Sequence, residues 1–148
     1  MASTLNPTTF KVKITEEQIV RSNVIKNEVT YTIENVTNVD HRILTCPSNT
    51  SVDLFNTNGL TPGAGTFPSS SLKYVRITNL DDTYNVAITI SGSQGDFTQE
   101  LTPTTSMFIV SSNITSSNFS GSFGDNIEFV KAYAMSSSVD LEYTLINT

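Results

Sequence analysis

Apolar and polar side chains alternate residue by residue over three stretches of this sequence. The segments 29–34, 86–91 and 139–145 each place branched or aromatic residues at every second position. Successive side chains of a β-strand point to opposite faces, so this period belongs to a strand with one buried and one solvated face. An amphipathic helix would repeat its apolar residues every three or four positions instead. The sequence therefore predicts half-buried antiparallel strands.

Weaker strand candidates fill the rest of the chain, and turn residues separate them. The turns include Cys46-Pro47-Ser48-Asn49, Asn79-Leu80-Asp81-Asp82 and Thr102-Pro103. The weaker candidates are 10–14, 42–46, 52–55, 72–78, 97–101, 107–110 and 127–135. Short strands at a spacing of roughly 8–12 residues are typical of sandwiches and barrels. We therefore predict an all-β fold, an antiparallel β-sandwich or jelly roll of roughly eight to ten strands.

The length of 148 residues suits one domain, and neither an internal repeat nor a convincing linker interrupts it. We predict a single β-sandwich domain over 1–148, in which residues 1–9 could lie as an extended arm. The segment 59–71 is rich in Gly, Pro and Ser and is expected to be a long loop. One helical alternative remains at Thr15–Ser22, where Thr15 would cap the helix.

Charge is sparse in this chain, and its balance is acidic. Charged residues make up 15% of the sequence, and the net charge is −6. Because the few Lys and Arg residues are dispersed, we expect no nucleic-acid partner. Since no long apolar run and no apolar N-terminal stretch occur, we expect neither a membrane span nor a secretory leader. The single cysteine, Cys46, fits synthesis in a reducing cytosol.

The residues that usually perform catalysis are nearly missing from the sequence. His41 is the only histidine, and Cys46 lies five residues later in the same predicted strand. Odd spacing directs the two side chains to opposite faces, so we expect His41 in a turn and Cys46 as a small buried hydrophobe. Zinc would need three or four such ligands. Asp81 and Asp82 are expected to stabilise a turn through side-chain hydrogen bonds. We predict no catalytic, cofactor or metal site, and no enzyme.

What remains is the surface, which is rich in Ser, Thr and Asn. Removing water from such a surface costs little free energy, because few charges have to be desolvated. Strand edges can also pair across a subunit boundary. Assembly is therefore the expected role. From a different functional class, a carbohydrate- or receptor-binding module is the alternative, for which Tyr84 and Phe67 are the aromatic candidates at loop tips.

The C-terminal half resembles small virion proteins of tailed bacteriophages, including marine and cyanobacterial ones. The segments that carry the likeness are SLKYVRITNLDDTYNVAITISG, FTQELTPTTSMFIV and IEFVKAYAMSSSVDLEYTLIN. A strand of the form Tyr-x-Arg-Ile-x-Asn leads to an Asp-Asp turn, and the last hairpin ends in a Glu-Tyr strand. The matching residues are Tyr74, Arg76, Ile77, Asn79, Asp81, Asp82, Pro103, Ala132, Ala134, Val139, Glu142 and Tyr143.

The resemblance implies a structural component of the virion, present in many symmetry-related copies and made in the bacterial cytoplasm. We expect a capsid decoration, or cement, protein that forms a homotrimer and binds and bridges capsid subunits. The partners would be the major capsid protein or other virion proteins. A tail, neck or fibre-base component is the alternative within the same class.

Five residues are the candidates for structural or interaction roles in that setting. They are Tyr74, Arg76, Asp82, Glu142 and Tyr143. In the predicted strand, Arg76 shares a face with Leu72 and Tyr74. We expect Arg76 to pair with a carboxylate such as Asp82 or Glu142, and an edge-strand charge without such a partner is the alternative.

Overall fold

The fold is all-β, as predicted. A computed structural model describes residues 8–57, 72–92, 95–110 and 127–148, which form ten strands and no helix. Each of the ten predicted strand segments overlaps one strand of the structure. None of the described residues belongs to a helix that could cross a membrane. The chain divides at Thr37 into two compact units, an N-terminal hairpin and a unit that runs from Asn38 to Asn147.

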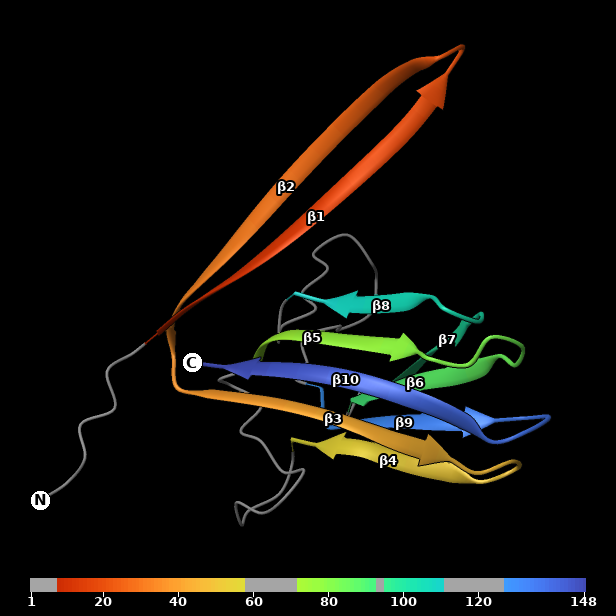
Figure 1. Cartoon of the computed structure of the whole chain (residues 1–148). Helices are drawn as coiled ribbons and strands as arrows, with labels where there is room; N and C mark the ends of the chain where they lie inside the picture. Colours follow the sequence, from red (N-terminus) through yellow and green to blue (C-terminus); the bar gives the residue numbers. More distant parts are fainter. Residues whose placement is uncertain (1–7, 58–71, 93–94, 111–126) are drawn as a thin grey trace, which may run out of the picture. The chain divides into compact units, whose positions relative to one another are not determined.

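The N-terminal unit is a long antiparallel hairpin of β1 (Thr8–Val20) and β2 (Asn23–Val36), drawn in red and orange in Figure 1. Its turn is Arg21-Ser22, and both residues have positive φ angles, 47° and 68°. The helical alternative for Thr15–Ser22 is therefore wrong. Pairing with β2 satisfies the backbone of this segment, and an ion pair between Glu17 and Lys26 at 3.0 Å joins the two strands.

The two faces of the hairpin differ in chemistry, as their alternation predicts. One face carries aliphatic and aromatic cross-strand pairs, among them Ile14 with Val29. The other face carries charges, with Lys13 2.8 Å from Glu28, and near its tip one apolar pair, Ile19 with Val24. The apolar face was expected to be half buried, yet Val29 is 39% exposed and Tyr31 is 41% exposed. Two strands alone cannot cover a face of their own sheet.

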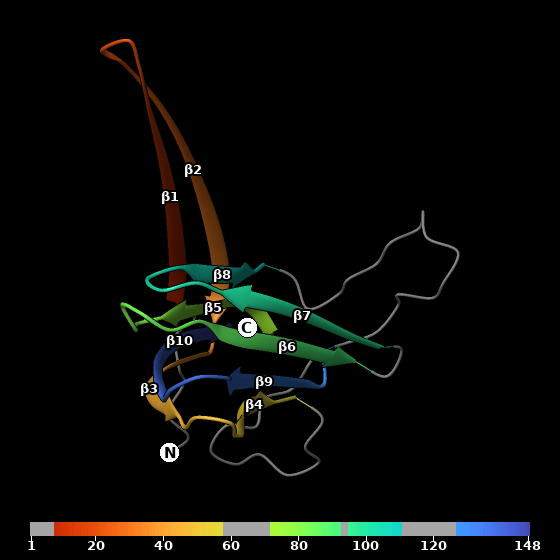
Figure 2. The ribbon, with the colours of Figure 1, turned by 90° about the vertical axis from the view of Figure 1, so that its right-hand side faces the viewer.

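The second unit consists of two four-stranded antiparallel sheets that pack face to face (Figures 1 and 2). The first sheet has the order β3 (Asn38–Cys46), β10 (Val139–Asn147), β5 (Leu72–Asn79), β8 (Ser106–Ile109). The second sheet has the order β4 (Ser51–Asn56), β9 (Phe129–Ala134), β6 (Val86–Gly92), β7 (Gly95–Leu101).

The pairing between these strands follows a simple rule. β6 pairs with β7, β5 with β8, β4 with β9 and β3 with β10, all antiparallel. The unit is thus one long hairpin of four strands against four, wrapped so that alternate pairs fall into opposite sheets. This is the strand order of a jelly roll. The sandwich or jelly-roll prediction is confirmed for residues 38–147.

The hydrophobic core lies between the two sheets. Period-two alternation places every second residue of β10 and β6 there, including Leu141 and Ile88, which are fully buried. Each such side chain stabilises the fold by about 1.5–3 kcal/mol. Cys46 is buried in this core, as predicted. His41 lies in the middle of β3 and not in a turn, and it points away from the core, as the odd spacing predicts.

A β-bulge changes the face of one predicted residue. Tyr74 pairs with Ile146, but Leu72 pairs with the next residue, Asn147, so Lys73 is an extra residue in β5. The extra residue turns Leu72 into the core, where it is 1% exposed. The prediction that Leu72 shares a face with Tyr74 and Arg76 is therefore wrong for Leu72.

Candidate functional site

The outer face of the first sheet, meaning the face turned away from the core, carries most of the candidate residues. Cross-strand register places its side chains in rows: Ile43 lies opposite Glu142, and Arg76 lies opposite Phe108. The residues of this outer face are Val39, His41, Ile43, Thr45, Tyr74, Arg76, Thr78, Ser106, Phe108, Asp140, Glu142, Thr144 and Ile146. Tyr74 and Ile146 are buried, while Ile43 and Phe108 are among those exposed.

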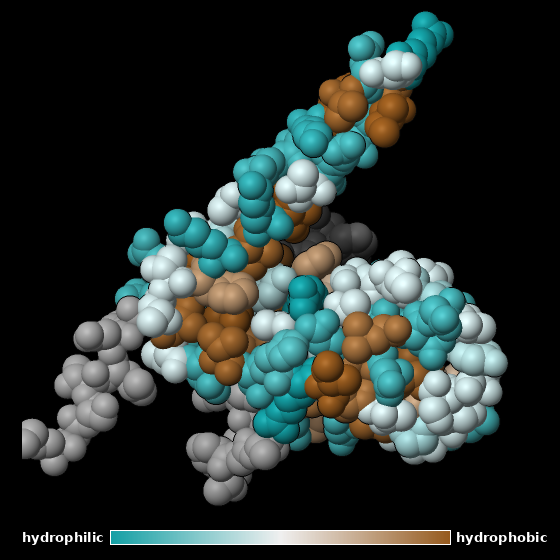
Figure 3. Space-filling model, viewed as in Figure 1, coloured by the Kyte–Doolittle hydropathy of each residue, from teal (hydrophilic) through white to brown (hydrophobic). Residues whose placement is uncertain are grey.

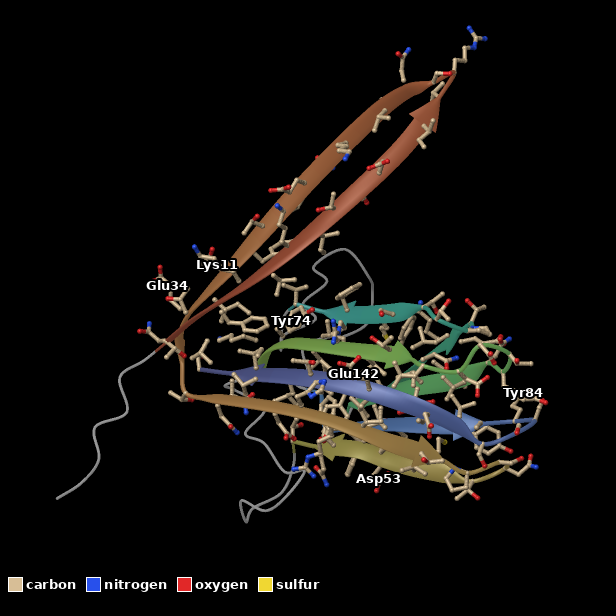
Figure 4. The ribbon with its side chains drawn as sticks, in the orientation of Figure 1. Lys11, Glu34, Asp53, Tyr74, Tyr84 and Glu142 are labelled. Carbon is tan, nitrogen blue, oxygen red and sulfur yellow. The ribbon has the colours of Figure 1, made fainter. Side chains whose placement is uncertain are left out.

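Three charged or titratable groups meet at the centre of the outer face. Glu142 Oε1 accepts a hydrogen bond from Arg76 Nη2 at 2.9 Å and lies 2.5 Å from His41 Nε2. Glu142 is on β10, and its two partners come from the neighbouring strands β5 and β3 (Figure 4). The hydrogen bond from His41 and the charge of Arg76 lower the pKa of Glu142, so the carboxylate stays charged and compensated.

The expected ion pair of Arg76 is therefore present, and its partner is Glu142. Around it, apolar side chains stand exposed: Ile43 is 64% exposed and Phe108 is 45% exposed. A face on which charges neutralise each other among exposed apolar groups costs little to desolvate. The arrangement fits contact with a protein surface.

Tyr143 lies on the opposite, core side of the same sheet. Its ring packs against Phe55 with centroids 5.9 Å apart, and its hydroxyl donates a hydrogen bond to Asp40 Oδ2 at 3.2 Å. Burial, followed by the negative charge of Asp40, raises the pKa of Tyr143 to about 12. Asp40 Oδ1 also accepts a hydrogen bond from Arg42 Nε at 3.1 Å. The geometry gives Tyr143 a structural role in the core.

Asp82 lies in the turn between β5 and β6, and it does not pair with Arg76. Its neighbour Asp81 accepts backbone hydrogen bonds from Thr83 and Tyr84 at 2.8 and 2.7 Å, while Asp82 Oδ1 accepts one from the Thr83 hydroxyl. These bonds confirm the prediction that the Asp-Asp pair stabilises a turn. Of the five candidate residues, Tyr74, Arg76 and Glu142 share the outer face, while Asp82 and Tyr143 lie elsewhere.

A shallow hollow lies beside the same turn, where Figure 4 shows Tyr84 at one end of the sandwich. Tyr84 is 40% exposed and Met135 is 60% exposed. Asn85 and Glu100 line the hollow as well, and they hydrogen-bond to each other. Phe67, the other aromatic candidate, is outside the described residues.

His41 is the member of the central cluster that the sequence did not indicate. It lies 101 positions before Glu142, so only the pairing of β3 with β10 reveals the contact. Among the described residues, no three His, Cys, Asp or Glu side chains gather in a way that could hold a metal ion.

Comparisons with protein families, with curated proteins and with solved structures find no match to this chain. The function is therefore inferred from the fold and from its surfaces.

Proposed function

We propose that this protein is a non-enzymatic structural component of a phage virion, a decoration protein that binds and bridges capsid subunits as a homo-oligomer, with a trimer as the expected state. The observation that carries the proposal is the outer face of the first sheet, where exposed apolar side chains surround a self-compensated ion pair. Such a face suits burial against a protein partner.

The jelly roll supports the proposal by analogy of fold. Viral capsid proteins use this architecture, although lectins and cupins use it as well. Fold alone does not assign function, so this analogy supports the virion role without establishing it. The resemblance of residues 72–147 to phage virion proteins points in the same direction.

The test is binding of the purified chain to heads assembled without it, measured by co-sedimentation. The variant Ile43→Glu adds a charge to the outer face, and we expect it to weaken binding by about tenfold or more. The matched control, Thr98→Glu, adds the same charge to the outer face of the second sheet and should bind like the wild type. Failure of the wild type to bind heads contradicts the decoration role, and binding to tails instead selects the tail or neck alternative.

An N-terminal arm belongs to the same proposal. Residues 1–7 are outside the described residues, while Thr8 and Thr9 belong to β1. Removal of residues 1–7 is expected to reduce occupancy on heads while the jelly roll stays folded. Unchanged occupancy would leave no role for the arm.

The hollow at Tyr84 favours a second candidate function, binding of a carbohydrate or receptor. An exposed aromatic ring beside Asn85 and Glu100 offers both a flat apolar surface and polar groups. A glycan array distinguishes the two functions. Signals that disappear in Tyr84→Ala would support the second candidate, and an array without signals would remove it.

A further inference from the structure

The N-terminal hairpin keeps a set of apolar side chains exposed on one face. Val20, Ile25, Val29 and Tyr31 are 42%, 56%, 39% and 41% exposed. The register of β1 and β2 places all four on the same side, and we refer to them as the hairpin patch. Figure 3 shows brown apolar residues near the tip of the hairpin, where Ile19 and Val24 also stand exposed, 68% and 53%, on the other face.

Several polar groups of the hairpin are paired within it. On the face of the hairpin patch, Asn27 Nδ2 donates a hydrogen bond to Glu16 Oε2 at 3.2 Å. On the other face, Lys13 pairs with Glu28 and Lys26 pairs with Glu17. A partner that covers the patch therefore needs to supply apolar surface and to leave the Glu16 carboxylate, which lies on the same face, hydrogen-bonded or in water.

Charge is divided unequally between the two units. Residues 1–37 contain four Lys or Arg and four Glu, so their formal charge is zero. Residues 38–148 contain four Lys or Arg and ten Asp or Glu, so they carry the whole net charge of −6. Two copies that met through their jelly rolls would oppose like charges, whereas two hairpins meet without this repulsion.

From these observations we infer that copies of this chain associate through the hairpin patch, and that the patch of one copy packs against the patch of another. Apolar side chains pack against apolar side chains in either symmetry: the same part of the patch meets itself around a twofold axis, and different parts of the patch meet around a threefold axis. Around a threefold axis, three hairpins turn their patches toward the axis. The contact also covers a two-stranded sheet, which is marginally stable in water when it stands alone.

The inference deepens the homo-oligomer of the proposed function and does not depend on binding to capsids. Loss of head binding with self-association intact removes only the decoration role. Self-association that is insensitive to the patch removes only this inference.

Cysteine cross-linking of the full chain is the first test, because the single native thiol, Cys46, is buried. Ile25→Cys and Val29→Cys place a small hydrophobe in the patch, while Thr15→Cys and Thr30→Cys place it on the charged face of the same hairpin. A disulfide requires Cα atoms within about 7 Å. We expect mild oxidation to link copies of a patch variant about tenfold faster than a control, because association raises the effective thiol concentration.

Sedimentation velocity of charge variants is the second test. Ile25→Glu is expected to weaken self-association by about tenfold or more, and Thr30→Glu is expected to change it little. Protection of Cys46 from thiol reagents verifies that the jelly roll of each variant stays folded. Equal cross-linking rates at patch and control positions, or equal association of the two Glu variants, would overturn the inference.

Discussion

Arg76 on β5 donates a hydrogen bond to Glu142 on β10, with Nη2 and Oε1 2.9 Å apart. The residue directly opposite Arg76 on β10 is Thr144, and Glu142 lies two positions before it. The ion pair thus runs diagonally over the outer face and, together with His41, ties three neighbouring strands of the first sheet. It stabilises the very surface through which we propose that the protein binds its partner.

Replacing Glu142 with Gln is expected to lower the free energy of unfolding at pH 7 by about 1 kcal/mol, a modest value because both side chains are partly exposed. The pKa of Glu142 is lower in the folded protein than its usual 4.5. Its contribution is therefore complete above that value and disappears as the pH falls through the lowered pKa. Urea unfolding of Glu142→Gln and wild type at decreasing pH measures this difference.

The control for that series is Asp53→Asn. Asp53 Oδ1 lies 3.8 Å from Lys131 Nζ and its side chain is 69% exposed, so its removal should change stability little. A Glu142→Gln difference that persists unchanged at the lowest pH would contradict the assigned ion pair.

Tyr143 should ionise well above the ordinary range of a tyrosine, because its pKa is raised to about 12. A raised pKa means that its contribution to stability is present below the ordinary value of 10 and is lost as the pH rises toward 12. Ultraviolet titration of phenolate measures this, with Tyr143→Phe as the comparison. Loss of an early-titrating group in Tyr143→Phe would show the assignment to be wrong. At neutral pH, Tyr143→Phe should lower the free energy of unfolding by about 1 kcal/mol.

Asn79 is fully buried and holds the turn after β5. Its amide nitrogen donates to the carbonyl oxygens of Tyr84 and Leu101 at 2.9 and 3.2 Å, and its side-chain oxygen accepts from Asp81 N at 3.0 Å. Asn79→Ala leaves these groups without a partner and should destabilise the protein by about 2–3 kcal/mol in urea unfolding. The exposed Asn85→Ala is the control and should cost far less. Similar losses in the two variants would contradict the role of Asn79.

The hairpin turn is expected to improve when Arg21-Ser22 is replaced by Asn-Gly. Both native residues have positive φ, which costs roughly 1–2 kcal/mol for each L-residue, and Asn-Gly is the sequence that two-residue hairpin turns prefer. Slower amide hydrogen exchange in β1 and β2 measures the gain. Ala-Ala at the same positions retains the strain and should exchange no more slowly than the wild type. No difference between the two replacements would contradict the turn geometry.

The strands of the jelly roll were predictable because their signal is local. Alternation in 86–91 and 139–145, with turn residues such as those after Asn79, placed β6 and β10 correctly. The sheet order was not predictable, because it depends on pairs far apart in the sequence. β3 and β10, for example, are the first and the last strand of the unit. The bulge at Lys73 likewise depends on pairing with β10 and has no local mark.

The length of the first hairpin strand was underestimated for a physical reason. The run Glu16-Glu17-Gln18 is polar and suits a helix by itself, so β1 was expected to end near Ile14. The strand continues to Val20 because Glu17 faces Lys26 and Thr15 faces Glu28 across the hairpin. Such compensation is visible only once both strands are paired. The division at Thr37 has no Gly or Pro to mark it.

The candidate site was predictable in part. The pairing of Arg76 with a carboxylate follows from a charged residue on a half-buried strand, and Glu142 was one of its two expected partners. The contribution of His41 was not predictable, because strand pairing alone brings it to Glu142.

The mass of the full chain in solution, measured by light scattering after size exclusion, tests the assembly role most directly. The account predicts a stable oligomer, with a trimer near three times 16.1 kDa, that persists in the absence of any ligand or metal. A particle of 16.1 kDa at every concentration would contradict self-association and, with it, the contact through the hairpin patch.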